Sequence, residues 1–250
     1  MLSHDTLLNR YLPSSLPRIA QPQFDVSWAT TWTEVRDVQR LRYRVFALEM
    51  GARVPSQRHG LDADEFDAYG DHLLVREPSE GAVIATCRVL SGHQAQTGRL
   101  QTDQAFDLAP LERFRPRMAE LGRACVDVHH RNRDVISALW RALIDHMADD
   151  GVSTMVGCFS IPLADGGRNA ASLWRRLSRA HLVEPELRVQ PRLPFPVHLL
   201  DSGLEAEVPE LLAALLGSGA RVLGAPGWDP TFGCADLPLL LQLDDIGHRA

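Results

Sequence analysis

The sequence has few cysteines, no excess of basic residues and no long apolar run, and each absence narrows the class of protein. Four cysteines in 250 residues form no Cys-x-x-Cys pair, which disfavours a disulfide or zinc framework and favours buried, reduced thiols. The formal charge is −6, with 26 basic and 32 acidic residues. A negative chain is a poor candidate for broad nucleic-acid binding, because phosphate contacts need a basic face.

No apolar stretch approaches the roughly 18 residues that cross a bilayer. The first residues place an acid before their apolar positions and lack the apolar centre of a signal peptide, so we expect a cytoplasmic protein. Residues 1–24 are rich in Pro, Ser and Gln and predict a flexible N-terminal arm. Residues 25–250 are expected to form a single domain, since hydrophobic residues make up 45% and charged residues 23% of the chain.

Hydrophobic periodicity predicts strands that alternate with helices. Residues 26–32 read as a first strand, and Thr33 is the expected N-cap of a helix that ends at Gly51. This helix carries apolar residues at helical spacing, namely Val35, Val38, Leu41, Val45 and Leu48. An acidic loop over 61–71 follows, and a hairpin pairs 72–77 with 82–90.

The second half of the chain continues the same alternation. Further strands are expected at 118–128, 153–161 and 234–243, and helices at 134–151, 171–182 and 208–224. Pro238 suggests that the last strand lies at an edge or contains a bulge. The pattern indicates an α/β fold around a partly antiparallel sheet.

The segment 120–134 carries the clearest chemical signal. It reads as a strand, a short turn and a helix that begins near Arg131–Asp134. Backbone N–H groups at a helix N-terminus suit an anion such as phosphate, and Arg131 and Arg133 reinforce that charge preference. Many such turns bind nothing, so this pattern alone does not identify a site.

The same segment resembles motif A of the GNAT acyltransferase superfamily, whose loop in most members holds the pyrophosphate of coenzyme A with glycines. Residues 131–136 contain no glycine, which argues against ordinary acetyl-CoA use. Four motifs in order, at 40–52, 65–75, 85–90 and 120–126, resemble the acyl-carrier-protein-dependent branch. That branch includes acyl-homoserine-lactone synthases and ornithine N-alpha-acyltransferases. Residues 219–241 resemble the latter, and no Trp follows Phe46 as in the lactone synthases.

The resemblance implies a GNAT-like mixed, largely antiparallel sheet with a V-shaped split between its central strands and helices on both faces. It also implies an active site lined by residues that match the branch by position: Arg42 or Arg44, Phe46, Asp67, Asp71, Arg88, Glu120 and Arg123. The carrier's phosphopantetheine arm and the oxyanion are expected near Cys125, Val126, Arg131 and Arg133.

The residue chemistry fits N-acylation. An amine is mostly protonated at pH 7, so a general base must take a proton before it attacks a thioester. Glu120 lies among apolar and small residues, where desolvation would favour that role; the alternative is a salt bridge with Arg123. A bulge between Gly122 and Val126 could aim backbone N–H groups at the oxyanion, or be a simple bend of the sheet.

The remaining charged candidates each have two interpretations. Asp67 and Asp71 could hold a substrate ammonium, or belong to a solvated acidic loop. Arg42, Arg44 and Arg88 could bind a substrate carboxylate, although an internal ion-pair network is expected for most of them. A basic run at Arg113, Arg115 and Arg117 could dock an acidic carrier protein or be merely solvated. The adjacent His129 and His130 point to opposite sides of an extended chain, so no metal site is expected.

The resemblance therefore predicts an enzyme that moves a long, 3-hydroxylated fatty acyl group from acyl carrier protein to the α-amine of ornithine. Other acceptors, such as glutamine, glycine, lysine or S-adenosylmethionine, remain open, as does an inactive GNAT-fold module that only binds a carrier or a lipid. No cofactor is expected beyond the donor's 4′-phosphopantetheine arm, and acyl-CoA is the alternative donor. A lipid product implies peripheral association with the inner membrane face.

Overall fold

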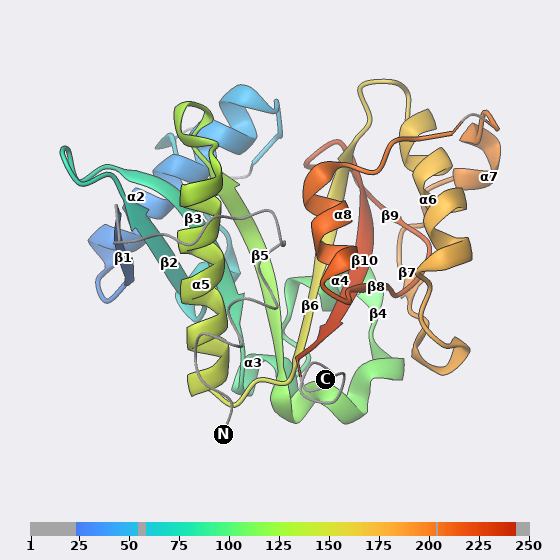
Figure 1. Cartoon of the computed structure of the whole chain (residues 1–250), viewed down its shortest axis with the longest axis horizontal. Helices are drawn as coiled ribbons and strands as arrows, with labels where there is room; N and C mark the ends of the chain where they lie inside the picture. The colour runs from blue at the N-terminus through green and yellow to red at the C-terminus, as the bar shows by residue number, and fades with distance from the viewer. Residues whose placement is uncertain (1–23, 55–58, 204, 244–250) are drawn as a thin grey trace. The chain divides into compact units, whose positions relative to one another are not determined.

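The computed structural model describes residues 24–54, 59–203 and 205–243 (Figure 1), so the predicted N-terminal arm lies outside the described residues apart from Phe24. The chain divides into two compact units. Unit 1 comprises Met1–Ser91 and Leu121–Gly151, and unit 2 comprises Gly92–Glu120 and Val152–Ala250. Each unit is assembled from two separate chain segments, and a single domain over 25–250 stays a prediction.

Unit 1 contains four neighbouring strands in the order β1 (Asp25–Trp28), β2 (Asp71–Arg76), β3 (Val83–Leu90) and β5, whose range Met118–Val126 begins in unit 2. β2 pairs antiparallel with both β1 and β3, which confirms the predicted hairpin. Every residue of β3 is buried, because helices cover both faces of these strands. Figure 1 shows α5 (Arg133–Asp149) in front of them and α2 (Trp32–Arg42) behind.

The N-terminal helix begins two residues earlier than predicted. Thr31, not Thr33, is the N-cap of α2, and its side chain forms a capping box with Glu34. The prediction placed the cap at the next Thr and so missed the glutamate three residues after Thr31. The cap is strong because Glu34 also accepts from the backbone N–H of Thr30 at 2.9 Å.

After Arg42 the helix widens into a π-helix, η1 (Tyr43–Glu49), closed by a bond from the Met50 N–H to the Val45 carbonyl. A π turn holds more residues than an α turn, so the apolar stripe rotates out of register with the core. Val45 is buried, as expected, but Leu48 is 66% exposed, which corrects the prediction that it faces the core. The helix ends before Gly51, whose φ of +76° suits glycine.

Unit 2 is centred on the antiparallel pair β6 (Thr154–Pro162) and β10 (Cys234–Gln242). On its other side β10 pairs with two short strands, β9 (Gly227–Asp229) and β8 (Arg221–Val222). The last strand is therefore central, and the prediction of an edge position was wrong. Pro238 is tolerated because it lies between the residues that pair with β9 and those that pair with β8, where its missing N–H leaves no ladder bond unmade.

Helices α6 (Arg168–Ala180) and α8 (Glu210–Gly217) contribute to an apolar core with β6 and β10. The smaller helices of the described chain are η3 (Glu65–Ala68), α3 (His93–Gln96), α4 (Gln101–Ala105), η4 (Ala109–Arg117), η5 (Val128–His130), η6 (Pro185–Leu187) and α7 (Val197–Leu200). A two-stranded sheet joins β4 (Phe106–Asp107) to β7 (Gln190–Pro191).

The mixed, largely antiparallel α/β architecture is confirmed within each unit. The V-shaped split concerns how the two units meet, and it stays a prediction. All four cysteines carry free thiols, and Cys87, Cys125 and Cys234 are buried, as the sequence predicted. Within the described residues, no helix combines the length and the apolar character needed to span a bilayer.

Candidate active site

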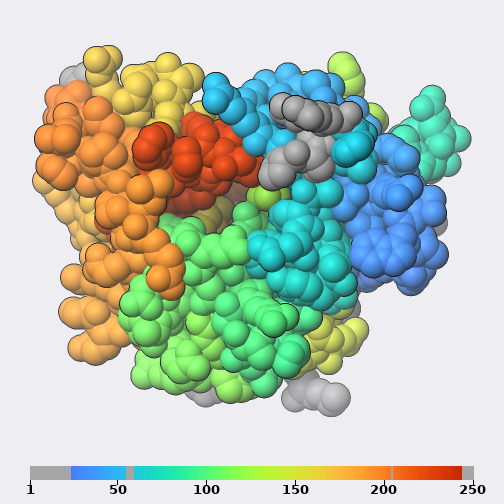
Figure 2. All heavy atoms as spheres, turned by 180° about the vertical axis from the view of Figure 1, so that it is seen from behind, coloured from blue at the N-terminus to red at the C-terminus, as the bar shows by residue number. Residues whose placement is uncertain are grey.

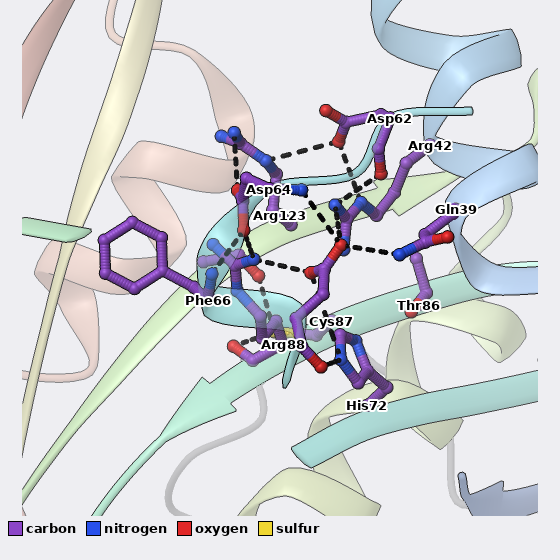
Figure 3. A network of polar contacts seen from close by, with 12 residues as sticks. Gln39, Arg42, Asp62, Asp64, Phe66, His72, Thr86, Cys87, Arg88 and Arg123 are labelled. Atoms are coloured by element: carbon purple, nitrogen blue, oxygen red, sulfur yellow. Dashed lines mark hydrogen bonds and ion pairs between the residues drawn. The ribbon is translucent and has the colours of Figure 1, made fainter. Parts of the chain in front are cut away.

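The acidic loop of unit 1 folds onto three arginine side chains that come from a helix and two strands (Figure 3). Asp64 begins the short helix η3, because its side chain accepts from the Phe66 N–H at 3.0 Å. The Asp62 N–H donates to the Gln39 carbonyl at 3.1 Å, which ties the loop to α2. The loop is therefore built into the unit and is not a solvated acidic segment.

Arg42 is fully buried at the centre of this network. Its Nε donates to Asp62 Oδ2 at 2.8 Å, and its Nη1 donates to Asp67 Oδ1 at 2.8 Å. Its Nη2 donates to the Asp62 carbonyl at 2.6 Å and to Asp67 Oδ2 at 3.0 Å. The guanidinium thus joins two points of the loop, which confirms the expected internal ion pair for this residue.

Arg88 and Arg123 complete the network from β3 and β5. Arg88 Nη1 donates to Asp64 and, at 2.6 Å, to Asp67 Oδ1, and its guanidinium lies 5.3 Å from the centre of the Phe66 ring. Arg123 places Nη2 3.0 Å from Asp64 Oδ2 and Nε 3.2 Å from Asp62 Oδ2. Three arginines thereby balance three aspartates in the interior of unit 1.

Burial and charge set the protonation states in this cluster. Burial opposes ionisation of Asp67, but Arg42 and Arg88 outweigh it and hold the pKa of Asp67 well below its usual range. Burial lowers the pKa of His72, which keeps the imidazole neutral at pH 7 beside the Asp67 carbonyl, 3.2 Å from Nε2. Burial also lowers the pKa of Arg123, and the positive charges of Arg42 and Arg88 lower it further.

Two features of the network point beyond a structural role. Asp62 is fully buried, and within the described chain no donor reaches its Oδ1, although a buried acceptor normally has a partner. Arg123 is the one non-glycine residue in the described chain with positive φ, at +51°. Such strained backbone concentrates at functional sites. The less deeply buried members, Asp64 and Arg123, are the ones that can present charge to a ligand.

Glu120, the predicted base, lies at the end of the unit 2 portion of β5 and is 3% exposed. Its Oε2 accepts from the Thr102 N–H of α4 at 2.8 Å. Burial is the main cause that raises the pKa of the Cys158 thiol on β6, and the charge of Glu120 raises it further. A carboxylate in such an enclosed, oriented position suits proton transfer.

The other predicted residues lie outside the arginine–aspartate network. Arg44 approaches Asp127 at 3.6 Å, and Asp71 lies at 3.3 Å from His146 on the exposed surface. Phe46 packs partly buried against the core of unit 1. Burial raises the pKa of Cys125 to about 12, so its thiol is inert. Val126 ends β5.

The predicted anion-binding turn has protein partners of its own. Arg131 forms a bidentate pair with Glu49, at 2.6 and 2.7 Å. The Asn132 side chain caps α5 by accepting from the N–H groups of Asp134 and Val135. Arg133 is the first residue of that helix.

The run of three arginines in η4 does not form one surface. Arg115 is buried, with Nη2 2.6 Å from Asp103 and Nε 2.7 Å from Glu112. Arg113 lies against the Phe114 ring at 4.7 Å. In the described chain two groups could hold a cation, Asp71–His146–Asp150 and Asp229–Cys234–Asp236; neither includes His129 or His130.

The sequence interpretation missed Asp62 and Asp64, which together pair with all three arginines of the network. It paired Asp67 with Asp71 instead, because a spacing of four suggested one site. The number of arginines on buried elements could have indicated Asp62 and Asp64. Three such arginines require three acids nearby, and the loop supplies them.

Comparison with known proteins identifies the family of the chain. A family model described as an Acetyltransferase (GNAT) domain matches residues 41–141. The L-ornithine N(alpha)-acyltransferase of Rhodobacter capsulatus is 34% identical over 244 residues, which cover 90% of this chain and 92% of that protein. The Brucella abortus protein of the same name is 28% identical over 252 residues, covering 90% of this chain and 86% of its own.

A solved structure supports the fold alone. The structure of FeeM, an N-acyl amino acid synthase from uncultured soil microbes, matches with a TM-score of 0.50 at 12% identity and covers 90% of this chain and 94% of that one. Together with the family model, this similarity confirms the GNAT-like fold predicted from the four motifs.

Proposed function

Because the chain belongs to the family of the L-ornithine N(alpha)-acyltransferases, we propose that it transfers a long, 3-hydroxylated fatty acyl group to the α-amine of ornithine. The product would be a lyso-ornithine lipid. The observation that carries this proposal is the similarity to the Rhodobacter capsulatus enzyme along nearly the whole of both chains.

The proposed acyl transfer needs one general base from the protein. The neutral α-amine attacks the thioester carbonyl, forming the C–N bond and a tetrahedral oxyanion. Collapse of that intermediate breaks the C–S bond and expels the thiolate of the phosphopantetheine arm. Glu120 takes the amine's proton, directly or through a water, and that proton can then reach the departing sulfur. The α-amine is favoured over the side-chain amine, because an α-amino group has a pKa near 8, about two units below that of a side-chain amine.

The arginine–aspartate network supplies a rigid, charged surface for the acceptor in this proposal. Arg42, Arg88 and Asp67 hold the loop in place, since their charges already pair with one another. Asp64, whose side chain is partly exposed, would attract the ornithine side-chain ammonium, and Arg123 would attract its carboxylate. Five residues keep their predicted roles as proposals, Arg44, Phe46 and Asp71 toward the acceptor and Cys125 and Val126 toward the oxyanion.

We further propose acyl carrier protein as the donor's carrier, because the turn at 131–136 lacks the glycines that commonly hold coenzyme A pyrophosphate. Arg131 and Arg133 would meet the phosphate of its pantetheine arm. The reaction is assigned to the cytoplasm, with the enzyme peripheral on the inner membrane face.

A donor and acceptor matrix tests the proposal. The purified full chain is incubated with 3-hydroxyacyl carrier protein or 3-hydroxyacyl-CoA, and with ornithine, lysine, glutamine, glycine or S-adenosylmethionine in competition. Mass spectrometry should find the ornithine amide as the main product, formed faster from the carrier thioester. No amide with any acceptor, together with tight binding of the carrier, would show a binding module instead.

A further inference from the structure

The end of the π-helix η1 and the turn η5 form an exposed apolar tip on unit 1. Leu48 is 66% exposed and Met50 53% exposed at the end of η1, and Val128 is 52% exposed in η5. Figure 1 shows the turn between β5 and α5 at one end of unit 1, beside the end of the α2–η1 helix. We call these three residues the apolar tip.

Two ion pairs join the halves of the apolar tip. Glu49, between Leu48 and Met50, forms the bidentate pair with Arg131, three residues after Val128. Arg44, one turn earlier in the helix, approaches Asp127 at 3.6 Å. Figure 2 shows the light-blue end of η1 at the surface of the molecule, with yellow-green atoms beside it. The ion pairs therefore bring the end of η1 and the turn η5 together at the surface.

The exposure of these side chains is imposed by the local backbone. In a continuous α-helix, Leu48 would follow Val45 on the buried stripe. The π-helical bond from the Met50 N–H to the Val45 carbonyl turns Leu48 outward. π-Helical turns are frequent at functional sites. Large apolar side chains that lie close together and face water are typical of interaction sites.

The segments 44–53 and 127–134, which carry the apolar tip, hold four arginines and three acids, so they are locally positive although the whole chain is acidic. Arg53 and Arg133 are exposed, and the side chains of Arg44 and Arg131 are partly exposed. Glu49 and Asp127 pair with Arg131 and Arg44, and the third acid, Asp134, directly follows Arg133. An apolar centre in a locally positive region matches a bilayer surface whose headgroups are anionic.

We infer that the apolar tip docks the enzyme on an anionic lipid surface, with Leu48 and Met50 inserted among the headgroups. The inference rests on the proposed function, since a single-chain acyl amino acid must leave the enzyme for a lipid phase. It goes further by naming the residues that meet the bilayer. Headgroup charge and apolar insertion both contribute, so binding should weaken with salt and with loss of either apolar side chain.

Sedimentation of the full chain with vesicles tests this assignment without any substrate. The probes are vesicles of phosphatidylcholine alone and vesicles that contain equal parts of phosphatidylcholine and phosphatidylglycerol. Wild-type protein should bind the anionic vesicles and bind the neutral ones at least tenfold more weakly. The double variant Leu48→Ser, Met50→Ser should lose about tenfold or more of the partition coefficient, which is about 1.4 kcal/mol or more, because two apolar side chains no longer enter the bilayer.

Leu199→Ser is the matched control, because Leu199 is 76% exposed on α7 of unit 2. It should bind as wild type does. Equal losses in the control and the double variant would overturn the inference, and so would wild-type binding by the double variant or no binding of anionic vesicles at all. Size-exclusion chromatography could show that the wild type and the control are dimers and that the double variant is a monomer. In that case the apolar tip joins two copies of the chain and the inference is wrong.

A failure of this inference is distinguishable from a failure of the proposed function. The double variant should acylate ornithine from a soluble donor at the wild-type rate without vesicles, because neither Leu48 nor Met50 belongs to the proposed site. Vesicle binding by a chain that makes no amide would support the apolar tip and contradict only the proposed reaction.

Discussion

Removing the charge of Asp67 should lower the free energy of unfolding far more than removing the charge of Asp71, four residues later. The Asp67 carboxylate accepts side-chain hydrogen bonds from Gln39, Arg42 and Arg88 at distances of 2.6–3.0 Å. Asp67→Asn keeps the size of the side chain but leaves three arginines facing two aspartates. Breaking a buried ion pair on one side costs about 3–5 kcal/mol.

Asp71→Asn is the matched control, since the Asp71 side chain is 53% exposed and its ion pair in the described chain is with His146 at 3.3 Å. Its replacement should change the free energy of unfolding by less than about 0.5 kcal/mol. Urea unfolding at pH 7, followed by tryptophan fluorescence and circular dichroism, measures both. In thermal melts the Asp67 variant should lose about 6–20 °C. A loss below about 1 kcal/mol for Asp67→Asn, or equal losses for the two variants, would refute the reasoning.

The same pairing has a defined pH dependence. The folded-state pKa of Asp67 is depressed, while its unfolded value is about 3.9. The stabilisation is therefore fully present above about pH 4 and is lost as the pH falls toward the folded-state pKa. The Asp67→Asn variant should lose this part of the acid dependence, whereas Asp71→Asn should keep it.

Three further predictions concern catalysis, helix capping and thiol chemistry. Glu120→Gln should lower kcat by about 10²–10⁴ while the melting temperature stays near wild type, as steady-state kinetics and calorimetry would show. Thr31→Ala should cost about 1 kcal/mol in urea unfolding and Thr33→Ala under about 0.5, because only Thr31 forms the capping box with Glu34; the reverse order would contradict the assigned cap. Iodoacetamide at pH 8 should leave Cys125 unmodified in the folded protein and alkylate it in urea, as peptide mass spectrometry would report, since its folded-state pKa is about 12.

Local patterns predicted the regular elements well, because an element's own sequence determines which face it buries. The hairpin of β2 and β3 and the helix α5 follow from periodicity alone. Leu48 departs from its stripe because the choice between an α and a π turn depends on packing around η1. Pro238 sits in a central strand because two separate short strands share one side of β10. Neither feature has a local sequence signature.

The sequence predicted which types of residue form the candidate site better than it predicted which of them pair with one another. Arg42, Arg88 and Asp67 were identified, and the expected internal network connects them. Asp62 and Asp64 were missed because a loop has no period from which the direction of its side chains can be derived. Their roles depend on arginines 20 to 61 positions away in the sequence, so only the tertiary fold specifies them.

The most direct test of the proposed reaction is the position of the new amide bond. The full chain is incubated with 3-hydroxyacyl carrier protein and ornithine that carries ¹⁵N only at the α-amine, and the product is fragmented in a tandem mass spectrometer. The proposal predicts that the acyl fragment retains the ¹⁵N label and that the Glu120→Gln variant forms the same product far more slowly. An acyl group on the unlabelled side-chain nitrogen, or no amide at all, would contradict it.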